Sequence, residues 1–131
     1  MQIYVDTSAL VKLVVLEGES AALRGYFEDF PGDTQFTAAV ARTELVRAVA
    51  RRGLIDVIEN ARFALSRLDL VALNNSVLDA AATIAPPELR TLDAIHLAAA
   101  RTAPELRAMV TYDSRLAEAA IGAGIAVVTP T

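Results

Sequence analysis

Two polar side chains stand three positions apart in a mostly apolar stretch, RTLDAIHLAAA, that runs from Arg90 to Ala100. They are Asp93 and His96, and His96 is the only histidine in the sequence. We interpret the stretch as a helix, in which residues three apart lie on the same side. A carboxylate among apolar groups is costly unless something pairs with it. Asp93 therefore predicts a cation nearby.

Further acids stand beside apolar segments. Asp6 ends the segment IYVD and Asp113 ends AMVTYD, and both segments predict strands. Ligand sites in open parallel sheets lie beyond the carboxyl ends of the strands, so we expect both acids at one edge of the sheet. Glu44 lies on a predicted helix whose apolar residues mark an inward face. The sequence thus predicts that four carboxylates converge: Asp6, Glu44, Asp93 and Asp113.

Converging carboxylates would repel one another and raise each other's pKa values. Divalent cations remove this repulsion, and two Mg²⁺ ions would balance four ionised carboxylates. Magnesium prefers oxygen ligands and keeps several waters, which suits a site made of acids alone. A pair of such ions about 4 Å apart suits in-line attack of water on a phosphodiester. The chemistry predicted for the four acids is therefore metal-dependent phosphodiester hydrolysis.

Each acid also has an ordinary structural explanation. Asp6 could simply be a helix N-cap, Glu44 could pair with Arg47 on the surface, and Asp93 could be favoured by the helix dipole in its first turn. It is the coincidence of all four that weakens these explanations. For His96 we favour a structural, hydrogen-bonded histidine over a ligand, because magnesium rarely binds imidazole.

The composition is that of a globular protein, with 54% hydrophobic and 21% charged residues. A length of 131 residues suits one domain, predicted to span residues 1–131. The absence of cysteine excludes disulfides and thiolate metal sites. The net charge of −4 argues against a broad basic surface for nucleic acid, but not against an enzyme that acts on nucleic acid.

The hydropathy pattern bears on partners and location. The mean hydropathy of +0.41 suggests that a partner or a second copy covers some apolar helix surface. No apolar run approaches the roughly 20 residues of a membrane span. The opening MQIYVD does not have the pattern of a secretory signal. We therefore expect a cytoplasmic protein without a membrane segment.

Strand and helix patterns alternate along the sequence, which predicts an α/β fold with a parallel sheet covered on both faces. The predicted strands are residues 3–6, 34–38, 69–73, 108–113 and 125–130. The predicted helices are residues 7–15, 20–30, 39–53, 55–68, 76–85, 90–100 and 114–124. We expect Asp6 or Thr7 to cap the first helix and Gly53 to end the third.

Four segments carry a resemblance to known proteins: VDTSALVKL, RTELVRAVARRG, LRTLDAIHLAAA and VTYDSRLAEAAIGAGIAVVTP. Together they resemble PIN-domain ribonucleases, and more closely the VapC-type toxins of bacterial and archaeal toxin–antitoxin pairs. The resemblance covers essentially the whole chain. It implies a PIN-like three-layer α/β fold, with a central parallel sheet of about five strands flanked by helices. It also implies hydrolysis of RNA, usually a specific transfer or ribosomal RNA, and silencing by a VapB-type antitoxin.

The resemblance also implies roles for the acids. Asp6 would be the central ligand of Mg²⁺ or Mn²⁺, and Glu44 and Asp93 would complete the first metal site. Asp113 would lie across it and assist a second ion or the attacking water. Thr111 matches a small hydroxyl residue often found near the centre. The family's start further implies that Thr7 and Ser8 orient Asp6 or a substrate phosphate.

Expected partners are the RNA substrate, a cognate VapB-type antitoxin that also binds DNA, and a second copy of the chain. Arg47 and Arg51 could contact RNA phosphates or the antitoxin, although a solvated arginine face has equal weight. The apolar helices at residues 8–16 and 21–30 could form a groove or dimer face, or could simply cover the sheet.

Three other functions are compatible with a chain of this length and class. A receiver domain needs a lysine at the end of its last strand, but Lys12, in the first helix, is the only lysine. A haloacid-type phosphatase needs an acid two positions after its first, where this chain has Ser8. The remaining alternative is a PIN-like module that binds RNA or protein without cutting. The presence of all four acids favours the enzyme.

Overall fold

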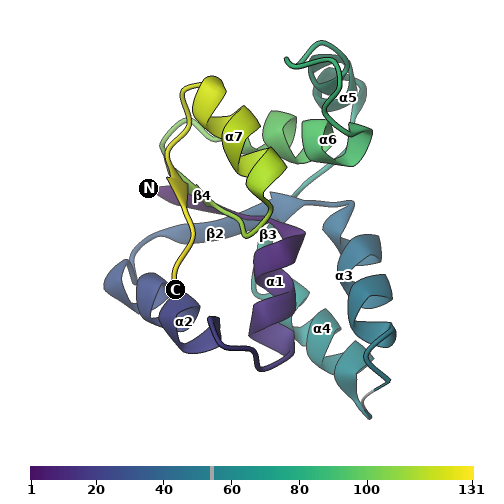
Figure 1. The fold of residues 1–131 in the computed structure, drawn as a ribbon, viewed down its shortest axis with the longest axis vertical. Coiled ribbons are helices and arrows are strands. Elements are labelled where there is room, and N and C mark those ends of the chain that lie inside the picture. Colours follow the sequence, from purple (N-terminus) through teal and green to yellow (C-terminus); the bar gives the residue numbers. More distant parts are fainter. Residues whose placement is uncertain (54) are drawn as a thin grey trace.

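The computed structural model describes residues 1–53 and 55–131. Within this part of the chain, five strands form one parallel sheet in the order β3-β2-β1-β4-β5. The strands are β1 (Gln2–Val5), β2 (Thr34–Ala38), β3 (Asp69–Val71), β4 (Leu106–Val110) and β5 (Val127–Val128). Figure 1 shows this sheet between two groups of helices. The predicted α/β class and parallel sheet of about five strands are confirmed.

The helices of the described residues alternate with the strands. They are α1 (Thr7–Val14), α2 (Ser20–Asp29), α3 (Ala41–Ala50), α4 (Val57–Ser66), α5 (Asn75–Ala82), α6 (Thr91–Ala100) and α7 (Ser114–Gly122). Helices α1 to α4 lie on one side of the sheet, and α5 to α7 lie on the other (Figure 1). The result is the three-layer arrangement that the resemblance implied.

The side chains of β1 explain the two layers. Successive residues of a strand point to opposite faces of the sheet. Ile3 and Val5 belong to the apolar cluster under α1 to α4, whereas Tyr4 belongs to the cluster under α6 and α7. All three are fully buried. The central strand is therefore covered on both faces, and its carboxyl end opens at one edge of the sheet.

Several boundaries differ from the prediction by a few residues; strand β4, for example, ends at Val110 and not at Asp113. Helix α4 begins at Val57 and not at residue 55, because Asp56 has a φ of 62° and ψ of 5°, a left-handed conformation that cannot belong to a right-handed helix. Strand β5 is only two residues long and pairs only with β4 at the edge of the sheet. Helix α3 ends at Ala50, three residues before the predicted stop at Gly53, which has a positive φ of 66°.

The amino ends of three strands are joined by one carboxylate. Asp33 precedes β2 and pairs with Arg107 of β4 and, at 3.1 Å, with the terminal amine of Met1 before β1. Arg107 also lies over the ring of Phe30, 3.9 Å from its centroid. Arg107 holds the pKa of Asp33 below its ordinary value of 3.8. This clamp lies at the edge of the sheet opposite to the carboxyl ends.

We expect Asp33→Asn to lower the melting temperature at neutral pH. Because the folded-state pKa of Asp33 is depressed, its stabilising contribution is present above the unfolded value and is lost as pH falls through the folded value. The difference in melting temperature between wild type and variant should therefore begin to shrink as the pH falls from about 7 to below the ordinary pKa of 3.8. Thermal unfolding followed by circular dichroism measures it. A gap that stays constant over this range would contradict the assignment.

Candidate functional site

All four acids predicted from the sequence line a single cavity of about 470 Å³. It opens beyond the carboxyl ends of β1 and β4. The remaining lining comes from Thr7, Ser8, Arg90, Thr91, Leu92 and His96. The structure thus brings together side chains that are up to 107 positions apart in sequence, from Asp6 to Asp113.

Local structure explains how each acid reaches the cavity. Asp6 follows β1 and is the N-cap of α1, where its side chain accepts from the backbone amide of Ser8. Asp113 follows β4 and caps α7 in the same way. Glu44 and Asp93 lie in the first turns of α3 and α6. The N-cap and first-turn explanations of the sequence analysis are thus correct, and they coexist with the convergence of the acids.

Hydroxyl groups hold one oxygen of Asp6 and leave the other less engaged. Oδ2 of Asp6 accepts from the hydroxyls of Ser8 at 2.8 Å and Thr111 at 2.9 Å. Thr111 is fully buried, and its Oγ1 also accepts from the backbone amide of Asp113 at 3.1 Å. Oδ1 of Asp6 lies 3.7 Å from Nδ1 of His96. Thr111 therefore couples two of the acids, although it does not itself line the cavity.

His96 is almost fully buried between Tyr4 and Glu44. Its Nε2 lies 2.6 Å from Oε1 of Glu44, and its Nδ1 lies 2.5 Å from the hydroxyl of Tyr4. That hydroxyl accepts from the backbone amide of Ala38 at 3.2 Å. The expected hydrogen-bonded histidine is thus observed. The sequence did not reveal that one of its partners is an acid of the cavity.

The hydrogen-bond network indicates which nitrogen of His96 carries a proton. Burial raises the pKa of Tyr4, so its hydroxyl keeps a proton that it can donate to Nδ1. The neutral imidazole then carries its hydrogen on Nε2 and donates it to Glu44. A protonated imidazole makes the same donation. In both states Nε2 is a donor that holds the Glu44 carboxylate.

Opposing effects set the pKa values of this pair. Burial is the largest effect on Glu44 and disfavours its charged form, but the hydrogen bond and charge of His96 together with the hydrogen bond from Thr7 outweigh it and lower the pKa of Glu44. Burial is likewise the largest effect on His96 and opposes its protonation, but the hydrogen bond to Glu44 and the charges of the surrounding acids together outweigh it and raise the pKa of His96. Thr7 also donates to Oε1 of Glu44, at 3.0 Å. Glu44 is therefore held ionised at neutral pH.

Arg90 is the cation beside Asp93 in this structure. Its Nε donates to Oδ2 of Asp93 at 3.1 Å, and its Nη2 donates to Oδ2 of Asp113 at 3.0 Å. Burial and the charge of Asp113 raise the pKa of Asp93, although the hydrogen bond from Arg90 opposes them. Arg90 is not among the site residues predicted from the sequence. Its position at the N-cap of α6, three residues before Asp93, was the signal available.

The two arginines predicted to contact RNA or antitoxin lie elsewhere. Arg47 and Arg51 are both exposed, and neither lines the cavity. Among residues 1–53 and 55–131, neither makes an ion pair. This agrees with a solvated arginine face and leaves their predicted contacts as predictions.

The donor set of the cavity suits a hard divalent cation, because it offers carboxylate oxygens from four acids. Across the described parts of the chain, however, no three His, Asp or Glu side chains are already arranged to hold an ion. The reason is visible in the contacts. Asp93 and Asp113 turn to Arg90, whereas Glu44 binds His96 through Oε1 alone. The residues fit a metal in chemistry and location once Asp93 and Asp113 turn toward it.

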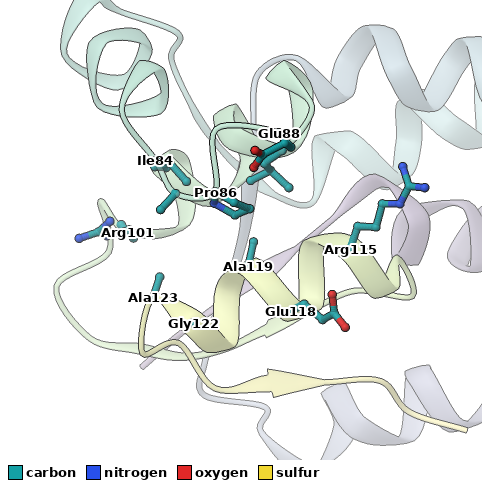
Figure 2. Close-up of a pocket in the computed structure, with 11 residues that line it drawn as sticks. Ile84, Pro86, Glu88, Arg101, Arg115, Glu118, Ala119, Gly122 and Ala123 are labelled. Carbon is teal, nitrogen blue, oxygen red and sulfur yellow. The ribbon is translucent and has the colours of Figure 1, made fainter.

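A larger cavity, about 740 Å³, lies between α7 and the segment at residues 84–89. Figure 2 shows Pro86 and Ala119 facing each other across it, with Arg101 and Arg115 toward opposite ends. Its lining is mostly apolar and includes none of the four acids. Size alone does not make it the site of chemistry, so we place the candidate site in the smaller cavity.

Comparison with known proteins identifies the family. The family model described as PIN domain matches residues 3–122. This chain belongs to the PIN-domain family. Within the family it is similar to three proteins of Mycobacterium tuberculosis named Ribonuclease VapC. PIN-domain ribonucleases of the VapC type depend in general on divalent metal ions.

These three relatives match the PIN-domain chain over nearly its whole length. Ribonuclease VapC47 of strain CDC 1551 / Oshkosh is 44% identical, covering 98% of this chain and 96% of the relative. Ribonuclease VapC46 of strain ATCC 25618 / H37Rv is 45% identical, covering 98% of both. Ribonuclease VapC35 is 44% identical, covering 98% of this chain and 96% of the relative.

Solved structures share the fold at low sequence identity. VapBC2 from Rickettsia felis, bound to a DNA fragment from its promoter, superimposes with a TM-score of 0.76 at 12% identity and covers 100% of both chains. VapC20 of Mycobacterium tuberculosis, a toxin that cleaves the sarcin–ricin loop, gives a TM-score of 0.75 at 18% identity, covering 98% of this chain and 99% of that one. These structures confirm the PIN-like fold.

Proposed function

We propose that this PIN domain is an endoribonuclease that uses Mg²⁺ or Mn²⁺, and the toxin of a VapBC-type pair. The observation that carries the proposal is the gathering of Asp6, Glu44, Asp93 and Asp113 around one cavity. Relatives at 44–45% identity that are named Ribonuclease VapC support the same activity. The proposal takes residues 1–131 as a single domain, as the sequence predicts.

In the proposed mechanism, the four acids would hold the divalent ions. Asp6 would be the central ligand, Glu44 and Asp93 would complete the first site, and Asp113 would assist a second ion or the attacking water. When bound, the ions supply activation of water and neutralisation of charge on the phosphodiester. The chain supplies orientation, because preorganised ligands avoid the cost of ordering during the reaction.

Supporting residues fix the orientation of two ligands. The hydroxyls of Ser8 and Thr111 occupy Oδ2 of Asp6, which leaves Oδ1 available to an ion. His96 and Thr7 donate to the same oxygen of Glu44, Oε1, and so leave Oε2 available. Asp6 and Glu44 thus each have one oxygen bound by the protein and one free to bind metal.

The proposed partners are RNA, a VapB-type antitoxin and a second copy of the chain, and the proposed location is the cytoplasm, where RNA is found. Among the described residues, no helix is long and apolar enough to cross a membrane. Arg47 and Arg51 are accessible to RNA or antitoxin. The Rickettsia felis pair, with its promoter DNA, provides the parallel for an antitoxin that binds DNA.

The apolar helices at residues 8–16 and 21–30 keep both roles that the sequence left open. Leu10 and Leu23 are buried in the core, whereas Phe27 is half-buried and Leu16 is 82% exposed. Large apolar side chains also stand exposed around α4, where Ile55 is 90% and Phe63 65% exposed. We therefore propose the outer side of α4 as the partner surface. Light scattering that shows a monomer at tens of micromolar would contradict the homodimer.

Induced expression in a bacterial host tests the proposed toxin function. We expect the wild-type chain to arrest growth and Asp93→Asn to be tolerated at equal protein level, because the variant lacks one carboxylate of the metal site. Measurement of culture density with immunoblotting of the protein gives the result. Equal growth of the two cultures would instead support a PIN-like module that binds without cutting.

A further inference from the structure

Arg90 stands between two of the acids from its place at the N-cap of α6. One guanidinium spans Asp93, on the same helix, and Asp113, at the start of α7. It therefore joins two elements that are both needed for the cavity. Arg90 itself lines the cavity.

The exposure of Arg90 indicates that releasing its side chain costs the fold little. Its side chain is 62% exposed, whereas those of Asp93 and Asp113 are 12% and 26% exposed. Ion pairs with such an exposed partner contribute little net stability. A divalent ion carries twice the charge of the guanidinium and can bind more of the surrounding carboxylates. The acids are therefore neutralised by a cation that is easy to replace.

We propose that Arg90 is an exchangeable counter-cation: it neutralises Asp93 and Asp113 in the metal-free protein, is displaced when a divalent ion binds, and then binds a phosphate of the RNA. The inference rests on the proposed ribonuclease function. A guanidinium freed at the rim of the cavity is suited to the second task, because its planar donors match phosphate oxygens. Arg90 thus competes with the metal for the carboxylates first and contacts the RNA backbone afterwards.

The first half of the proposal predicts that metal binds more tightly to Arg90→Gln than to wild type. With the competing charge removed, we expect the dissociation constant for Mn²⁺ to fall about five- to tenfold at low salt. The difference should shrink as salt is added. Isothermal titration calorimetry with MnCl₂ and no RNA measures it. Arg67→Gln is the matched control, since Arg67 precedes β3 at the opposite edge of the sheet.

The second half of the proposal predicts that the same variant cleaves RNA less efficiently, although it binds the metal more tightly. With Mn²⁺ saturating, Arg90→Gln should have a KM for RNA raised about tenfold, with a smaller change in kcat, because a contact with the RNA backbone has been removed. Arg90→Lys should recover part of the loss, since it restores a positive charge. Arg67→Gln should behave as wild type.

The outcomes separate this inference from the proposed function. Tighter Mn²⁺ binding together with a raised KM in Arg90→Gln supports it. Unchanged or weaker Mn²⁺ binding in that variant, while the wild type binds Mn²⁺ and cleaves RNA, overturns the exchange and leaves the ribonuclease standing. An unchanged KM overturns the phosphate contact. A wild type that neither binds Mn²⁺ nor cleaves RNA overturns both proposals.

Discussion

Asp6→Asn is expected to slow RNA cleavage by at least about a hundredfold, because even the outer partners of metal ligands cost 10–100-fold when they are lost. Asp6 is the acid whose orientation is most tightly set, with Oδ2 held by Ser8 and Thr111. The oxygen of an asparagine can keep these bonds. Its amide nitrogen would then replace Oδ1, and an amide cannot supply the negative charge that a divalent ion needs. Initial rates on a cleavable RNA measure the effect.

Two controls show whether a slower rate in Asp6→Asn comes from the lost carboxylate and not from unfolding. The melting temperature of Asp6→Asn in EDTA should stay close to that of wild type, because the hydroxyl partners remain satisfied. Asp79→Asn makes the same chemical change at an exposed position of α5 and should leave the rate unchanged. Wild-type rates in Asp6→Asn would remove Asp6 from the proposed metal site.

The second large effect is expected at His96. In His96→Ala, Glu44 loses the hydrogen bond that orients it, and the hydroxyl of Tyr4 loses the nitrogen to which it donates. We expect cleavage to fall roughly 10–100-fold, the usual cost of losing a group that orients a ligand. The variant should also unfold about 2–4 kcal/mol more easily, because a cavity and unsatisfied polar groups remain. Rates and chemical denaturation measure the two effects.

A conservative variant separates orientation from stability. His96→Gln can place an amide donor near the position of Nε2 and should recover part of the rate. Its affinity for Mn²⁺, measured by calorimetry without RNA, should exceed that of His96→Ala. A purely structural role predicts instead that rate follows stability in both variants and that the Mn²⁺ affinity of the folded protein does not change.

The sheet and the gathering of the acids could be predicted because they depend on local patterns. Asp6 and Asp113 each end an apolar segment, and parallel strands place their carboxyl ends at one edge of the sheet. Glu44 and Asp93 stand out because they interrupt apolar helix faces. Periodicity and topology are enough to bring these four residues together.

The supporting network could not be predicted, because it depends on side-chain contacts between distant segments. Tyr4 has the pattern of a core residue of β1, and nothing in its neighbourhood indicates that its hydroxyl meets His96, 92 positions away. The reach of Arg90 to Asp113 depends on how α6 packs beside β4 and α7. The left-handed Asp56 was equally hidden, because a non-glycine residue rarely adopts that conformation.

Mapping of cleaved ends in total cellular RNA is the decisive measurement. Purified wild type and Asp93→Asn would be incubated in parallel with Mg²⁺, with Mn²⁺ and with EDTA. We predict cuts at one or a few sites that require the metal and are absent with EDTA and in the variant. Identical end profiles for the two proteins with metal present would contradict a metal-dependent ribonuclease at these four acids.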